Sequence, residues 1–274
     1  RSRTPPFVTT ALDRLGLKCA RAVIISASDA GLTYGVNEGV RQARHAGIVS
    51  DASLLVVGPF AREAVNRLGG SLGIQLALSA EHELLEMRPV TYAPSLLGGR
   101  GGFPIDAADA AEHADPDEVY REFVAQIERA KTLGVTPTFL ASHDDVVARH
   151  LAIFDVFLDV AEEFALPIRH GYNFGVNALD ASAIAKRRGH FVADQTINWT
   201  AGTTLRETLA TLPAGVTELI VHPAIASDDV AAVLADANTR SASLGELLAL
   251  AGTPWAQELA IETLSWSDIS ARLA

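Results

Sequence analysis

A histidine and two aspartates, His143, Asp144 and Asp145, follow directly after an apolar run that ends in Ser142. On an extended segment, an imidazole and a carboxylate two residues further along point to the same side. Both groups bind divalent metals, and both act as general acids and bases. The pattern therefore predicts a metal site or an acid/base site. The competing interpretation is that Ser142 or Asp144 caps the following helix while His143 binds a buried carbonyl group.

Two other polar positions stand where an apolar run ends. Asp29 follows Ser28 and precedes an Ala-Gly pair, so it is either a ligand presented from a strand end or a turn residue. His222 precedes Pro223, so it is either a general acid near neutral pH or a histidine held by a rigid turn. The residues alone leave these alternatives open.

The elements that would position these groups are short, β-rich apolar runs with helical stretches between them. The runs cover Ala22–Ser28, Ser53–Val57, Leu72–Leu78, Pro137–His143, Pro167–Gly171, His190–Asp194, Glu218–His222 and Glu262–Trp266. Alternating β and α segments indicate parallel strands. We therefore expect an α/β fold, a TIM-like (β/α) barrel that is distorted or has seven to eight strands.

In a barrel of this kind, chemistry takes place where the strands end and the loops begin. The polar residues at the carboxyl ends of the expected strands are Ser28, Asp29, Gln75, His143, Asp144, Asp145, His170, Asp194 and His222. We expect several of them to converge on one site.

The chain has 274 residues, of which 49% are hydrophobic, enough for one sizeable core. No internal repeat, heptad pattern or Pro/Ser-rich linker divides it. We expect residues 1–20 to form an N-terminal tail and a lead-in helix, and residues 21–274 to form a single domain.

Charge and cysteine content limit the partners and the location of the protein. The formal net charge of -11 repels phosphate backbones and no basic run offsets it, so nucleic acid is not an expected partner. A single cysteine, Cys19, indicates a reducing compartment, and we expect a cytoplasmic protein. No apolar run approaches the roughly 20 residues of a membrane helix, so a membrane is not an expected partner either.

The order of the motifs resembles the YdjC-like carbohydrate deacetylases over nearly the whole chain. The segment Ala22 to Asn37 is similar to their L-x-I-x-N-A-D-D-x-G-x-S-x-x-V-N opening, and Gly47 to Pro59 is similar to G-I-V-T-S-x-S-L-M-V-x-x-P. Gly73 to Leu78 is similar to G-x-H-L-x-L, and Thr138 to His143 to T-H-x-D-S-H. Two later landmarks of the family are similar to Leu166 to Arg169 and Val221 to Pro223.

The resemblance implies a divalent metal, zinc or magnesium, that activates water against the N-acetyl amide of a sugar-like substrate. It places Asp29 and His143 at two of the family's metal-ligand positions, and His222 in the neighbourhood of its general acid. It also implies a homodimer.

Three positions depart from the family's pattern. Ser28 stands where the catalytic base is expected, Gln75 where a second histidine ligand is expected, and Ala141 where an aspartate is expected. A serine hydroxyl is not a carboxylate base at neutral pH, and a glutamine oxygen is a weaker zinc ligand than an imidazole. We therefore expect an altered active site.

Neighbouring residues are expected to refill this site. Asp145 is the expected third metal ligand beside Asp29 and His143. His82 is a more speculative ligand, and an exposed loop position is the favoured interpretation of it. The expected catalytic residues are His222, Asp144 and Ser28, and the expected substrate-binding residues are Gln75, Glu81, Arg169 and Tyr172.

Three functions remain open from the sequence. The first is a metal-dependent amidohydrolase, related to carbohydrate N-deacetylases, that acts on an N-acetylated sugar or a related small molecule. The second is a barrel enzyme that performs metal-free acid/base chemistry, such as elimination, isomerisation or cyclisation. The third is a non-catalytic homologue that binds a small ligand. Bound metal and chelator-sensitive turnover would distinguish the first function from the other two.

Overall fold

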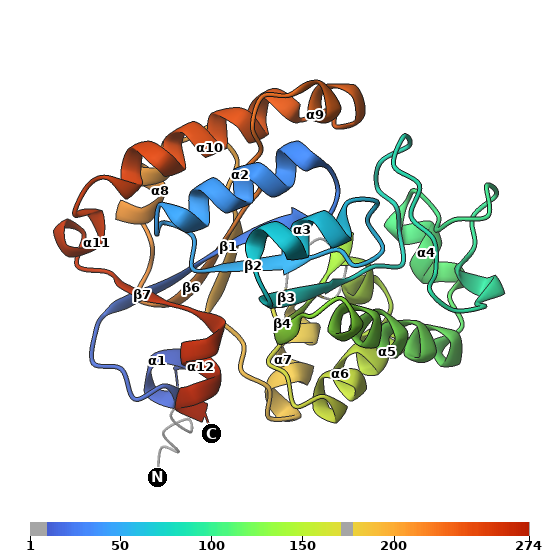
Figure 1. Cartoon of the computed structure of the whole chain (residues 1–274). Helices are drawn as coiled ribbons and strands as arrows, with labels where there is room; N and C mark the ends of the chain where they lie inside the picture. The colour runs from blue at the N-terminus through green and yellow to red at the C-terminus, as the bar shows by residue number, and fades with distance from the viewer. Residues whose placement is uncertain (1–9, 171–177, 274) are drawn as a thin grey trace, which may run out of the picture.

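The structure, a computed structural model, describes residues 10–170 and 178–273. Its parallel sheet has seven strands in the order β4-β3-β2-β1-β6-β5, with β7 paired to β1 (Figure 1). The strands are β1 (Arg21–Ala30), β2 (Asp51–Leu54), β3 (Ser71–Leu76), β4 (Thr136–Ser142), β5 (Gln195–Asn198), β6 (Gly215–Val221) and β7 (Glu262–Leu264). β7 lies along the first half of β1 and β2 along the second half.

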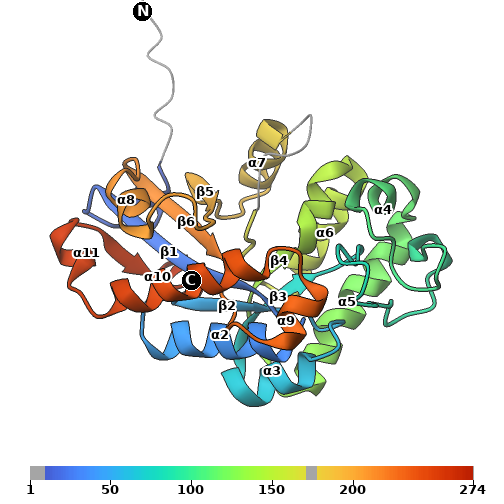
Figure 2. The ribbon, with the colours of Figure 1, turned by 90° about the horizontal axis from the view of Figure 1, so that it is seen from above.

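Helices follow most strands, and most of these helices cover the outer side of the sheet. They are α1 (Ala11–Arg14), α2 (Tyr34–His45), α3 (Ala61–Leu68), α4 (Ala107–His113), α5 (Pro116–Thr132), α6 (Leu151–Glu163), α7 (Ala178–Arg187), α8 (Leu205–Ala210), α9 (Asp228–Val233), α10 (Ala237–Ala251), α11 (Trp255–Glu258) and α12 (Trp266–Leu273). Figure 2 shows α2 and α3 on one side of the sheet and α5 and α6 beside β4.

Alternate residues of β1 and of β4 belong to two separate apolar cores. Ala22 and Ile24 of β1 pack with Phe139 of β4 and Trp266 in one buried cluster. Val23, on the opposite face of β1, belongs to the larger cluster that includes the helices. Because side chains alternate across a strand, the first cluster fills the inside of the curved sheet and the second lies outside it.

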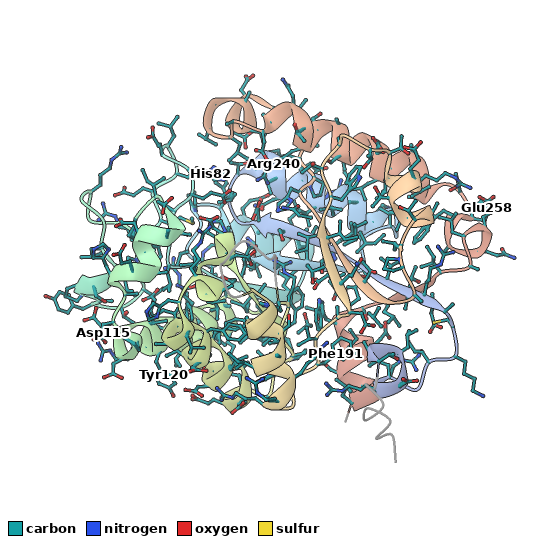
Figure 3. The ribbon with its side chains drawn as sticks, turned by 180° about the vertical axis from the view of Figure 1, so that it is seen from behind. His82, Asp115, Tyr120, Phe191, Arg240 and Glu258 are labelled. Atoms are coloured by element: carbon teal, nitrogen blue, oxygen red, sulfur yellow. The ribbon has the colours of Figure 1, made fainter. Side chains whose placement is uncertain are left out.

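One end of the barrel is closed by apolar packing. The Trp266 ring stacks on the Phe139 ring with 5.3 Å between ring centroids, and Ala11 of α1 and Ile269 of α12 belong to the same cluster. In Figure 3 the labelled Phe191 lies at this closed end, beside α1 and α12, whereas Arg240 and His82 lie at the opposite end. The open mouth is therefore at the carboxyl ends of the strands.

The barrel is not fully closed, in agreement with the expectation of a barrel that is distorted or has seven to eight strands. Two of the eight expected strands differ from the structure. Pro167–Gly171 contributes, among its described residues, one isolated bridge between Ile168 and Leu140. His190–Asp194 is not a strand; the strand in this region is β5, and Asp194 lies before it. The Thr196 hydroxyl of β5 donates to the His170 carbonyl at 3.0 Å, across the place where another strand would close the barrel.

The position of Asp194 corrects an expectation about the site. Asp194 lies at the amino end of β5, where its Oδ2 accepts from the Val216 backbone N–H at 2.9 Å. Its carboxylate therefore satisfies backbone donors at the closed end of the barrel and does not reach the mouth. The error arose because the apolar run before Asp194 contains residues that pack in the barrel interior, such as Phe191, without entering the sheet.

Gly73 on β3 tests the packing inside the barrel. A Cβ atom at this position would collide with the ring of Phe139, which leaves no room for it. We expect Gly73→Ala to lower the free energy of unfolding by about 1–3 kcal/mol through overpacking. Urea unfolding of Gly73→Ala, Phe139→Leu and the double variant measures the coupling, and the alanine should cost less in the leucine background. An equal cost in both backgrounds would show that the collision is not the cause.

Candidate active site

A cavity of about 200 Å³ opens at the mouth of the barrel. It contains nine of the ten site residues expected from the sequence, and the tenth, Tyr172, lies outside the described residues. The cavity is lined by Ser28, Asp29, Gln75, Glu81, Ser142, His143, Asp144, Asp145, Arg169, Asn198, Thr200, Ile220, His222, Asp236 and Arg240. The nine residues thus line one cavity, and their roles in it remain predictions.

The turn after β1 aims Asp29 into the cavity. Asp29 has a φ of 69°, a left-handed conformation that aspartate tolerates better than most residues. Gly31 follows with a φ of 107°, and its N–H donates to the Asn37 side-chain oxygen at 2.7 Å. A Cβ on Gly31 would meet the Leu55 carbonyl oxygen at 2.6 Å, so only glycine fits this turn. The backbone therefore fixes the direction of the Asp29 carboxylate.

Gln75, at the end of β3, links Asp29 to His143 through a buried amide. Its Oε1 accepts from the Asp29 backbone N–H at 3.1 Å and from the Ser53 hydroxyl at 3.0 Å. Its Nε2 lies 3.1 Å from Asp29 Oδ1 and 3.1 Å from His143 Nδ1. Since a backbone N–H can only donate, the oxygen of the amide must face it. A reversed amide would place its NH₂ group against this N–H donor and its oxygen against the Asp29 carboxylate, and would cost about 1–3 kcal/mol.

This orientation fixes the tautomer of His143. Because Gln75 Nε2 donates to Nδ1, a neutral His143 carries its proton on Nε2. Burial lowers the pKa of His143, although the Asp29 carboxylate acts in the opposite direction. The imidazole is therefore neutral at neutral pH, and its Nε2 faces Glu81 Oε2 at 3.4 Å.

Asp29 remains ionised because the Arg240 guanidinium pairs with it. Its Oδ2 lies 2.8 Å from Arg240 Nη1 and 3.7 Å from His222 Nε2. Burial would raise the pKa of Asp29, but the charge of Arg240, with smaller contributions from His222 and His143, outweighs burial and holds the pKa far below its usual value. The side chains of Asp29 and Arg240 are each only 4% exposed, so this ion pair is screened little by solvent.

Arg240 is the main site residue that the sequence analysis missed. It comes from α10, and its Nε also bonds Asp236 Oδ2 at 2.8 Å. An Asp and an Arg four residues apart usually indicate a pair on a helix surface, so nothing in the sequence showed that this guanidinium points into the barrel. Ser142, Asn198, Thr200 and Asp236 also line the cavity without having been assigned a role there from the sequence.

Glu81 is the acidic group at the rim of the cavity whose ionisation changes near neutral pH. Burial of its carboxyl and the nearby Asp29 charge raise the pKa of Glu81 to about 7, with His82 acting in the opposite direction. Its side chain is 39% exposed, so water reaches it. The alternative ligand His82 lies with its Nε2 3.7 Å from Glu81 Oε2, next to the rim.

His222 and Asp144 have shifted pKa values for the same reason. Burial lowers the pKa of His222 to about 4, and the nearby Arg240 and Arg169 charges act in the same direction against Asp29. Burial raises the pKa of Asp144, and His143 partly offsets this effect. His222 is therefore a neutral imidazole at neutral pH.

Ser142 has a structural contact as well as a place in the cavity. Its Oγ accepts from the Val147 N–H at 3.3 Å, while the neighbouring His143, Asp144 and Asp145 also line the cavity.

The arrangement of these groups does not fit a divalent metal. In residues 10–170 and 178–273, no three His, Cys, Asp or Glu side chains are grouped to hold an ion. Asp29 is engaged by Arg240 and Gln75, and His143 Nδ1 faces an amide nitrogen. A metal at Asp29, His143 and Asp145 stays a prediction from the sequence.

Comparisons with known proteins identify the family. The chain matches the sequence profile of the family described as YdjC-like protein over residues 22–264, so it belongs to that family. It is 30% identical to a carbohydrate deacetylase of Brevibacillus brevis over 258 residues, which cover 90% of this chain and 99% of the relative. It is 31% identical to a carbohydrate deacetylase of Thermoanaerobacter pseudethanolicus over 216 residues, which cover 76% and 83%.

A solved structure supports the fold. A crystal structure from Enterococcus faecalis V583, described provisionally as a cellobiose-phosphate cleavage protein, superposes with a TM-score of 0.78 at 22% identity. The match covers 91% of this chain and 98% of the other. The family and the (β/α) barrel expected from the sequence are thus confirmed.

The buried ion pair gives a stability prediction. Arg240→Met removes the guanidinium and leaves the Asp29 charge buried, which we expect to cost about 3–5 kcal/mol of unfolding free energy. Asp236→Asn is the matched control: it removes the other carboxylate on Arg240, which is 47% exposed, and should cost less than about 1 kcal/mol. Urea unfolding at neutral pH measures both, and equal effects would contradict the assigned importance of the Asp29 pair.

Proposed function

We propose that this protein is a hydrolase of the carbohydrate deacetylase type, which removes an acetyl group from an N-acetylated sugar or a related small molecule. The observation that carries the proposal is the 30% identity to the Brevibacillus brevis carbohydrate deacetylase along nearly the full length of both chains. The cavity at the mouth of the barrel, with acidic, imidazole and guanidinium groups, supports it.

Glu81 is the proposed general base. A base with a pKa near the working pH is both available in its ionised form and able to accept a proton. In the proposed reaction, Glu81 takes a proton from water as the water oxygen attacks the acetyl carbonyl carbon. The C–N bond then breaks, the amine nitrogen receives the proton, and acetate and a free amino sugar leave. The Nε2 atom of His143 lies 3.4 Å from the Glu81 carboxylate, without a hydrogen bond between them.

Other residues of the cavity would stabilise the negative charge that develops on the carbonyl oxygen. The Arg169 guanidinium is buried, and no described carboxylate lies within 4.0 Å of it, so its charge is available to a substrate. His222 offers a neutral imidazole beside Asp29. Ser28 Oγ is buried without a hydrogen-bond partner among the described residues, which suits a hydrogen bond to substrate.

Acetate release tests this function. Purified protein would be incubated with N-acetylglucosamine, N-acetylgalactosamine and their disaccharides, with and without EDTA, and the acetate would be quantified. We expect release by the wild type and loss of release in Glu81→Gln. Binding of these sugars without acetate release, also after addition of zinc or magnesium, would contradict hydrolysis and favour metal-free acid/base chemistry or ligand binding alone.

The pH dependence tests the role of Glu81. Its base form predominates above its pKa, so we expect kcat/KM to rise as the pH passes upward through about 7. Glu81→Gln should remove this limb and lower kcat/KM by about 10²–10⁴-fold. Glu83→Gln, an exposed carboxyl on the same loop, is the control and should retain the limb. A limb that persists in Glu81→Gln would assign the base to another group.

The remaining expectations about partners keep the status of predictions. A homodimer and a cytoplasmic location rest on the family resemblance and on the single cysteine. In the described part of the chain, no helix has the length and apolar character that crossing a membrane requires.

A further inference from the structure

We propose that the cavity works without a divalent metal, because the Gln75 amide nitrogen takes the place of a cation between Asp29 and His143. The claim that catalysis needs no metal rests on the proposed hydrolase function. The claim that the site does not bind a divalent metal is independent of that function. Within the described residues, Asp29 and His143 are the two buried metal-binding side chains that share one neighbouring atom, Gln75 Nε2.

The amide nitrogen satisfies both side chains as a donor. It lies 3.1 Å from Asp29 Oδ1 and 3.1 Å from His143 Nδ1, and its two hydrogens match these two acceptors. Its own lone pair is delocalised into the amide, so it is not a metal ligand. Zinc bound to an imidazole and a carboxylate lies about 2.0–2.2 Å from each ligand atom, and Nε2 and its hydrogens would then have to move away.

The amide is held in place from its other side. Gln75 is 4% exposed, and its Oε1 accepts hydrogen bonds from the Asp29 N–H and the Ser53 hydroxyl. Rotation of the amide to present Oε1 to a metal would turn the NH₂ group toward the Asp29 N–H, a donor that has no way to accept. The hydrogen bonds on both sides of the amide therefore hold Asp29, Gln75 and His143 together, and we call this the closed Asp29–Gln75–His143 arrangement.

Arg240 already supplies the positive charge that Asp29 requires. Its guanidinium bonds Asp29 Oδ2 at 2.8 Å and is itself 3% exposed. A divalent ion at Asp29 would lie close to this fixed cation and be repelled by it, with little solvent to screen the repulsion. The carboxylate is thus neutralised by a guanidinium and an amide, and both are part of the chain.

Cobalt and zinc titrations test the inference without an activity assay. Co²⁺ bound by imidazole and carboxylate in a tetrahedral site gives a visible absorption band, and Zn²⁺ displaces it. We expect the wild type to show no stoichiometric band. Gln75→His places an imidazole beside Asp29 and His143, and we expect this third ligand to tighten Zn²⁺ binding by about 100-fold or more.

Two further variants separate the effect of adding an imidazole ligand from the effect of removing the amide. Gln75→Leu removes the amide and adds no ligand, so it should bind Zn²⁺ more weakly than Gln75→His. His143→Ala in the Gln75→His background should abolish the band. If Gln75→His does not fold, the wild-type titration still decides the matter. One Co²⁺ per wild-type chain, with a band that is lost in His143→Ala, would overturn the inference.

The outcomes for metal and for turnover are independent. Acetate release that withstands EDTA, together with the expected titrations, supports both the proposed function and the inference. Absence of acetate release with the expected titrations contradicts the hydrolase function and leaves the closed Asp29–Gln75–His143 arrangement supported. Acetate release that is lost with EDTA and restored by Zn²⁺ contradicts the inference and supports the function.

Discussion

The buried carboxylate of Asp29 is the constraint on which the mouth of the barrel depends. A charge in a poorly solvated position requires compensation from the protein itself. Arg240 bonds one oxygen and the Gln75 amide bonds the other, while the Asp29 N–H bonds the same amide through its oxygen. In this way one side chain joins β1, β3 and α10. The position of His143 follows, because its Nδ1 is the second acceptor of that amide.

The convergence of these residues is a consequence of strand geometry. Side chains alternate along parallel strands, so residues of one parity fill the interior of the barrel. On β1 the inward series runs from Ala22 and Ile24 in the apolar core to Ser28 at the cavity. On β4 it runs from Phe139 and Ala141 to His143. The interior therefore changes from apolar to polar toward the mouth, and the same alternation that builds the core also presents the site.

This geometry explains what the sequence could predict. Apolar runs separated by helical segments were sufficient for the fold class, and the polar residues at the carboxyl ends of the runs were sufficient to place Asp29, His143 and His222 at the mouth. Two expected strands failed because local apolar character does not reveal whether a segment finds a partner in the sheet. Arg240 was missed because its role arises from the packing of α10 across the mouth, a contact 211 residues away from Asp29 in sequence. Glu81 was expected to bind substrate, and its proximity to His143 depends on a loop conformation with a φ of 59°.

The site separates groups with fixed protonation from a group that titrates. Asp29 stays ionised because the Arg240 charge outweighs the effect of burial on its pKa, and His143 and His222 stay neutral because burial lowers their pKa values. Burial of the Glu81 carboxyl at the rim, together with the Asp29 charge, raises the pKa of Glu81 toward the working pH instead of away from it. The buried Asp29 carboxylate thus holds Arg240 and Gln75 in place and also contributes to the raised pKa of Glu81. A change at Gln75 or Arg240 would consequently act at Glu81 as well, although neither residue bonds it.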